Sequence, residues 1–104
     1  MKSPHHIERG LAAPETLGLE TRVEIRKAAF RLLEEMPEGG GRLVIDLAQT
    51  RHVDSAGLGA LILIHRRAAE RRQVVALRNV GEELRYMLAL TKMDDLFEFE
   101  PDFG

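Results

Sequence analysis

A short polar segment with reactive side chains lies near the middle of the chain and reads His52-Val53-Asp54-Ser55-Ala56-Gly57-Leu58-Gly59. Histidine, aspartate and serine are the residue types of a hydrolytic triad, in which the histidine takes the proton of the attacking serine. Adjacent residues in an extended chain point to alternating sides, however, and the Gly-x-Ser-x-Gly turn that exposes such a nucleophile is missing. We therefore expect no catalytic residues here and do not interpret the chain as an enzyme.

The same segment does not fit a cofactor or metal site. Gly57-Leu58-Gly59 is only Gly-x-Gly, and Ile62 stands where a dinucleotide-binding motif needs its third glycine. The chain has no cysteine. Its four histidines share no metal-ligand spacing and are His5, His6, His52 and His65. We expect neither a cofactor nor a metal.

Local chemistry gives Ser55 a structural role. A serine directly before a helix accepts a hydrogen bond from a free backbone N–H of the first turn, so Ser55 is predicted as a helix N-cap. Gly57 and Gly59 allow a tight turn or the close approach of another molecule. By itself, this pattern requires no more than a well-capped helix.

Length and composition describe one compact domain over residues 1–104, with 44% hydrophobic and 31% charged residues. Fifteen basic against 17 acidic residues give a net charge of -2, which provides no basic field for direct nucleic-acid binding. The longest apolar run, Leu58 to Ile64, is too short for a membrane span, and no signal peptide is evident. The absence of cysteine fits a reducing compartment, so we expect a cytoplasmic protein.

Apolar periodicity predicts helices over 19–36, from residue 58 to the charged cluster at 70–72, and around 84–91. It predicts strands at 43–48, 74–77 and 97–99. Residues 1–18 show no sustained pattern, so we expect at most one short or degenerate edge strand there, and a loose tail at 101–104. Alternating strands and helices predict an α/β fold, with a mostly parallel sheet of about four strands and three to four helices.

Three stretches together resemble the STAS family of anti-sigma factor antagonists and their relatives. They are Leu43-Val44-Ile45-Asp46-Leu47, Val53-Asp54-Ser55-Ala56-Gly57-Leu58-Gly59-Ala60-Leu61 and Leu88-Ala89-Leu90-Thr91-Lys92-Met93-Asp94-Asp95-Leu96-Phe97. The resemblance covers residues 19–100 and implies a single STAS domain. It also implies that the serine matching Ser55 is phosphorylated by a cognate anti-sigma factor that is a kinase. The unphosphorylated protein then binds this partner and frees the sigma factor, and phosphorylation breaks the complex.

One position departs from the phosphorylated members of that family. They carry an acidic residue near the serine, at the end of an early strand, and the alignment places Gly18 there, with Glu15 as the substitute if the loop differs. We expect a Gly18→Asp variant to be phosphorylated faster and to keep its fold. The alternative function is a STAS subunit that is not phosphorylated and belongs to a lipid-transport ATPase complex or signalling assembly. A weak homodimer is left open.

The predicted partner-binding surface surrounds Ser55. Leu58 to Ile64 is apolar almost all round, but only one stripe of a helix can face the sheet. Leu63 lies opposite that stripe, so we expect an exposed patch of Leu63, Ala60 and Ala56 beside Ser55. The full predicted surface comprises Asp54, Ser55, Ala56, Gly57, Leu58, Gly59, Ala60 and Leu63.

Overall fold

A computed structural model describes residues 7–100, in which strands and helices alternate. The strands are β1 (Ile7–Ala12), β2 (Thr16–Leu17), β3 (Gly41–Asp46), β4 (His52–Val53), β5 (Val74–Arg78) and β6 (Glu98–Phe99). The helices are α1 (Arg22–Glu35), α2 (Ser55–Glu70), α3 (Glu82–Leu90) and the short 3-10 helix η1 (Asp94–Leu96). The tail expected at 101–104, and His5 and His6, lie outside the described residues.

Four strands form one parallel sheet in the order β1-β3-β5-β6, while β2 and β4 pair in a separate parallel ladder. The predicted α/β fold with a four-stranded, mostly parallel sheet is therefore confirmed. Parallel strands need crossover connections, and α1 and α2 supply them between β1, β3 and β5. None of the helices within residues 7–100 is long and apolar enough to cross a membrane.

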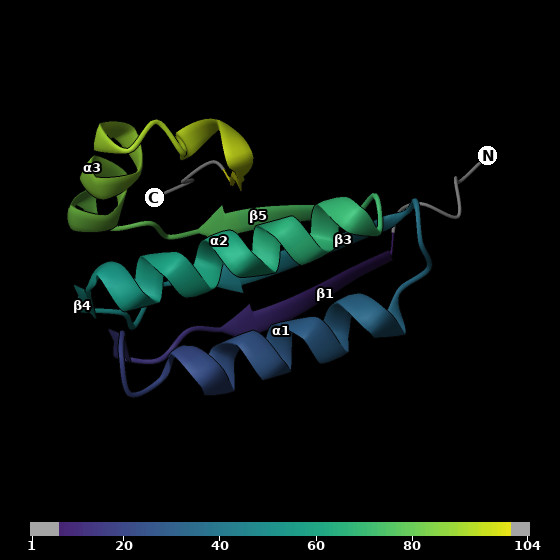
Figure 1. The fold of residues 1–104 in the computed structure, drawn as a ribbon, viewed down its shortest axis with the longest axis horizontal. Coiled ribbons are helices and arrows are strands. Elements are labelled where there is room, and N and C mark those ends of the chain that lie inside the picture. Colours follow the sequence, from purple (N-terminus) through teal and green to yellow (C-terminus); the bar gives the residue numbers. More distant parts are fainter. Residues whose placement is uncertain (1–6, 101–104) are drawn as a thin grey trace.

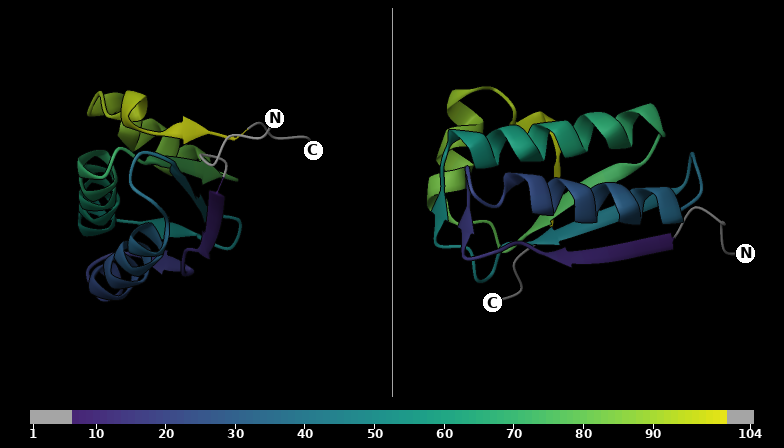
Figure 2. Two further views of the ribbon diagram at one scale, coloured as in Figure 1. Left: turned by 90° about the vertical axis from the view of Figure 1, so that its right-hand side faces the viewer. Right: turned by 60° about the horizontal axis from the view of Figure 1, so that its bottom comes forward.

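Helices α1 and α2 lie side by side against one face of the sheet, as Figures 1 and 2 show. Leu43 and Ile45 of β3 point to this face and are fully buried in the core beneath the helices. Both helices run parallel to each other, because each follows a strand and leads into the next parallel strand. Their N-terminal ends therefore lie together, at the carboxyl ends of the strands, where partners and ligands are commonly bound.

The opposite face of the sheet carries an ionic network that links all four strands, with residues on β1, β3, β5 and β6. Arg42 of β3 donates hydrogen bonds to Glu8 at 2.8 Å, to Glu98 at 3.2 Å and to Glu100 at 2.7 Å. Arg78 of β5 donates to the other oxygen of Glu100 at 2.8 Å. These two hydrogen-bonding arginines lower the pKa of Glu100, Arg42 having the larger effect. We call this group the sheet-face network.

The N-terminal segment is more regular than its sequence indicated. It contains two strands rather than at most one short strand, and β1 pairs with β3 over six residues, from Ile7 with Gly41 to Ala12 with Asp46. β1 lies at the edge of the sheet as expected, but with six paired residues it is neither short nor degenerate. Its central residues, Glu8 to Gly10, are exposed, so the buried alternation that marks a strand is absent.

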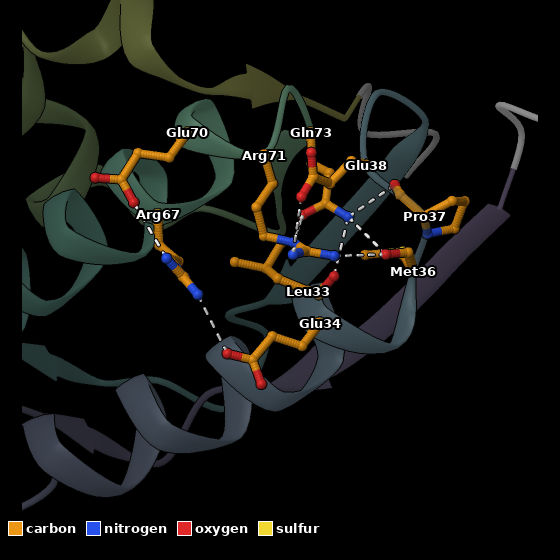
Figure 3. A network of polar contacts seen from close by, with 9 residues as sticks. All are labelled: Leu33, Glu34, Met36, Pro37, Glu38, Arg67, Glu70, Arg71 and Gln73. Atoms are coloured by element: carbon orange, nitrogen blue, oxygen red, sulfur yellow. Dashed lines mark hydrogen bonds and ion pairs between the residues drawn. The ribbon is translucent and has the colours of Figure 1, made fainter.

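The C-terminal end of α1 is held by polar side chains from the end of α2 and the turn after it (Figure 3). The Gln73 amide, only 6% exposed, donates to the carbonyls of Leu33 at 2.9 Å, Met36 at 3.2 Å and Pro37 at 3.1 Å. Arg71 adds a bond to the Met36 carbonyl at 2.9 Å. These bonds satisfy carbonyl groups that the end of a helix leaves without intrahelical partners.

Candidate partner-binding site

Asp54, and not Ser55, is the N-cap of α2. Its backbone is extended, and its Oδ1 accepts a hydrogen bond from the Gly57 N–H at 2.9 Å. Its Oδ2 accepts a second bond from the Leu19 N–H at 3.3 Å. The assignment of Ser55 as the cap was wrong because only the carboxylate, with two acceptor oxygens, reaches both the helix and the loop before α1. These hydrogen bonds lower the pKa of the Asp54 carboxyl, and the bond from the Gly57 N–H has the largest effect.

Ser55 is consequently free of a capping role. It is the first residue of α2, its side chain is exposed, and no hydrogen bond joins its hydroxyl to another of residues 7–100. His52 lies in β4 and is also exposed, and it makes no hydrogen bond to Ser55 within the described part of the chain. The geometry therefore presents a lone hydroxyl at the surface, and no residue of 7–100 is hydrogen-bonded to it as a base that could activate a nucleophile.

The two glycines that follow Ser55 have different structural roles. A methyl group on Gly57 would overlap the carbonyl oxygen of Leu17 and lie 2.5 Å from its carbonyl carbon. Gly57 is thus required because α2 begins directly against β2, whose Leu17 is fully buried. Nothing lies within 4 Å of the corresponding position on Gly59. Only Gly59 leaves room that another molecule could use.

Gly18, the position expected to carry an acidic side chain, is packed against Asp54. A Cβ on Gly18 would lie 2.5 Å from Asp54 Oδ2 and 2.8 Å from Asp54 Cγ. Any side chain here would therefore push the N-cap carboxylate out of position. This contact argues against the expectation that Gly18→Asp keeps the fold intact, because Asp54 already fills the space that a second carboxylate would need.

A recess of about 410 Å³ opens between the N-terminal halves of α1 and α2, and Ser55 is part of its lining. Its lining residues are Arg22 and Arg26 from α1, and Ser55, Ala56, Gly59, Ala60, Ile62 and Leu63 from α2. We call it the α1–α2 recess. It combines a hydroxyl, two guanidinium groups and apolar side chains, so it can contact a protein surface that is partly apolar and partly acidic.

Only some residues of the predicted surface are exposed. Leu63 is 38% exposed and lines the recess with Ala56. Ala60 is only 4% exposed, because α1 packs along that side of α2, and Leu58 is 8% exposed, because it faces the core. Neither these two residues nor the buried Gly57 can contribute the exposed area that the sequence suggested.

The basic side of the recess was missed from the sequence. Arg22 and Arg26 precede Ser55 by about 30 residues and reach it only because α1 and α2 pack side by side. One signal could have identified them. Arg22 begins α1, where the helix dipole disfavours a positive charge. An arginine at this unfavourable position suggests a role other than stabilising the helix.

Two other residues have structural roles. Asp46 accepts hydrogen bonds from the Ala48 N–H at 2.9 Å and from the Asn79 side chain at 3.0 Å, and so holds the turn after β3. The ring of His65 packs edge-on against Phe97 at 5.6 Å, and burial lowers its pKa.

Comparisons with known proteins agree with this architecture. Residues 12–98 match the family model described as "Mlab, STAS domain". A STAS-domain containing protein of Pseudomonas aeruginosa (strain UCBPP-PA14) is 33% identical over 57 residues, which are 55% of this chain and 56% of that protein. The match thus spans about half the length of this curated relative.

Two solved structures share the fold. A candidate anti-sigma factor antagonist from Thermotoga maritima superposes with a TM-score of 0.73 at 23% identity, over 96% of this chain and 91% of the other. A sulfate transporter family protein from Wolinella succinogenes has a TM-score of 0.69 at 14% identity, over 88% of this chain and 75% of the other. With the family model covering nearly all of the described residues, the chain belongs to the STAS domain family.

Proposed function

We propose that this STAS domain is a partner-switching regulator that works by protein binding in the cytoplasm and not by catalysis. In its unmodified form, the surface around the α1–α2 recess binds an anti-sigma factor that is also a serine kinase. A phosphate on Ser55 releases that partner. The observation that supports this proposal is the position of the Ser55 hydroxyl, which is exposed, free of a capping bond and part of the recess lining.

The switch itself is a phosphoryl transfer. The Ser55 oxygen would attack the γ-phosphorus of a nucleoside triphosphate held by the kinase. An O–P bond forms, the nucleoside diphosphate leaves, and the hydroxyl proton passes to a base of the kinase. The fold would tolerate the product, because the bonds that hold the start of α2 are made by Asp54 and not by Ser55.

Electrostatics give the direction of the switch. A phosphoserine carries roughly -1.5 to -2 charges, and here it would stand next to the Asp54 carboxylate. When a partner buries this surface, the phosphate and the Asp54 carboxylate repel each other more strongly, and the phosphate loses its contact with water. A change from almost fully bound to almost fully free needs about 5.5 kcal/mol of differential binding, which is within reach of a charge buried at an interface.

Three substitutions test this function against the purified partner by titration calorimetry. Ser55→Asp adds a charge beside Asp54 and should weaken binding, whereas Ser55→Asn has the same size without the charge and should bind nearly normally. Ser55→Ala should bind and, because Asp54 is the cap, should change the free energy of unfolding by no more than about 0.5 kcal/mol. Equal affinities of the Asp and Asn variants would exclude charge at Ser55 as the switch.

A second candidate is a constitutive STAS subunit of a lipid-transport ATPase complex. The "Mlab" description of the family model favours it, and so does the absence of an acidic residue at Gly18. This candidate predicts that the partner co-purified from cells is a transporter ATPase, and that Ser55 carries no phosphate. Affinity purification followed by mass spectrometry reads both properties in one experiment.

A further inference from the structure

The two arginines of the α1–α2 recess have no counter-ion among residues 7–100. Arg22 and Arg26 stand one turn apart on α1, and neither makes an ion pair or a side-chain hydrogen bond there. By contrast, Arg67 and Arg71, at the other end of the helix pair, are both paired with carboxylates. Two unpaired guanidinium groups at the edge of one recess are an anion-binding arrangement.

The helix pair is also unevenly joined. At the C-terminal end, Arg67 of α2 contacts Glu34 of α1 at 3.4 Å, next to the bonds made by Arg71 and Gln73 (Figure 3). At the N-terminal end, no side-chain hydrogen bond or ion pair joins α1 to α2 within residues 7–100. Asp54 joins the start of α2 to the loop before α1, and an anion between Ser55 and the two arginines would add a connection between the helices themselves.

A phosphate on Ser55 would need such cations. A helix N-terminus can bind an anion through its free N–H groups, but here the Asp54 carboxylate already accepts the Gly57 N–H and contributes its own negative charge. The end of α2 therefore offers little to a second anion. The positive charges that share a recess with Ser55 are those of Arg22 and Arg26.

We propose that Arg22 and Arg26 form a clasp for the phosphate on Ser55. The clasp ties the N-terminal ends of α1 and α2 together and fills the α1–α2 recess from within the same chain. Phosphorylation then removes the partner by occupying the cations and the space of its binding site, in addition to repelling it. This inference rests on the proposed function in one respect only, namely that Ser55 is the residue modified.

The full chain with phosphoserine incorporated at position 55 allows a direct test, without kinase or partner. The second pKa of a phosphoserine is about 6, and neighbouring cations lower it. Phosphorus NMR across a pH titration measures this second pKa. In the chain that keeps both arginines, it should lie below about 6. Replacing both arginines, Arg22→Gln with Arg26→Gln, should raise that value by at least about half a pH unit, or roughly threefold in proton affinity.

Matched variants separate a clasp from a general charge effect. Lys27→Gln removes one positive charge from α1 at an exposed site that does not line the recess, so it should leave the phosphate titration almost unchanged. Arg22→Lys and Arg26→Lys keep the charge and should recover part of the shift. Circular dichroism checks the fold of each variant. If the double Gln variant does not fold, the single variants Arg22→Gln and Arg26→Gln are compared with the Lys variants instead.

Two results would overturn the clasp. One is a phosphate that titrates identically with and without the two arginines. The other is an equal shift in the Lys27→Gln control. The outcome is independent of the partner-switching test. If Ser55→Asp and Ser55→Asn bound the partner equally while the arginines still shifted the phosphate pKa, the proposed function would fail and the clasp would stand.

Discussion

The different surroundings of Gly57 and Gly59 predict opposite effects for the same substitution two residues apart. Alanine favours a helix over glycine by about 0.5–1 kcal/mol, so an unobstructed replacement in α2 should stabilise the protein. At Gly59 nothing lies within 4 Å of the added methyl group. Gly59→Ala should therefore raise the free energy of unfolding by about that amount.

At Gly57 the same methyl group would overlap the Leu17 carbonyl oxygen and lie 3.0 Å from Leu17 Cγ. Non-bonded carbons prefer about 3.5–4.0 Å, so β2 and the start of α2 would have to separate by roughly 1 Å. Leu17 is fully buried and cannot move outward freely. Overpacking of this kind costs about 1–3 kcal/mol, and more where backbone must shift, which exceeds the gain in helix propensity.

Urea denaturation followed by circular dichroism measures both variants against the parent. The two free energies of unfolding should differ by about 2–4 kcal/mol, with Gly57→Ala below the parent and Gly59→Ala above it. For a domain of this size, that gap corresponds to melting temperatures separated by about 10–30 °C. A Gly57→Ala protein as stable as the parent, with an unchanged denaturant slope, would refute the assigned contact between α2 and β2.

Three further predictions concern Gly18, Asp54 and Gln73. Gly18→Asp should lower the melting temperature and slow phosphate incorporation by a cognate kinase, because it displaces Asp54; an intact fold with faster incorporation would contradict this. The lowered pKa of Asp54 means that its stabilising effect is complete above the unfolded value of about 3.9 and is lost as the pH falls through the lower folded value. Melting temperatures of the parent and Asp54→Asn, recorded from about pH 7 to 2, should therefore converge in acid; a difference that does not change with pH would argue against a charged cap. Gln73→Glu places a carboxylate oxygen against the carbonyls of Leu33 and Met36 and should lower the free energy of unfolding by about 1–3 kcal/mol at neutral pH. Urea denaturation measures this loss, and a loss smaller than about 0.5 kcal/mol would contradict the role given to the Gln73 amide.

Periodicity predicted the elements that have a buried side. The helix over 19–36, the strand at 43–48 and the strand at 74–77 all appear, with boundaries shifted by up to three residues. α1 begins at Arg22 and not at Leu19, because the Thr21 hydroxyl bonds to the backbone of Thr16 and Gly18 and holds the preceding loop. The length of strand β1 and the presence of β2 were missed because their pairing uses backbone groups, which leave no trace in the residue types.

The candidate site could be located from the sequence but not assembled. Asp54 and Ser55 are both good N-caps, and what decides between them is the Leu19 N–H, which approaches from a different loop. The packing of α2 against β2 decided that Gly57 is needed for space. Arg22 and Arg26 enter the site only through contact between two helices. Each of these facts depends on tertiary neighbours and not on local sequence.

The sheet-face network also limits how two copies of the protein could associate. Stacking a second sheet on this face would require removing Arg42, Arg78 and their carboxylate partners from water, which is costly for charged groups even when they are paired. Pairing along the edge strand β1 is opposed by its exposed Glu8 and Arg9, since charged residues on an edge protect it from joining another strand. The helical side, with the α1–α2 recess, carries neither of these obstacles and remains available for self-association. A second copy bound there would compete with the proposed partner for the same surface, and apparent partner affinity would then fall as the concentration of the protein itself rises.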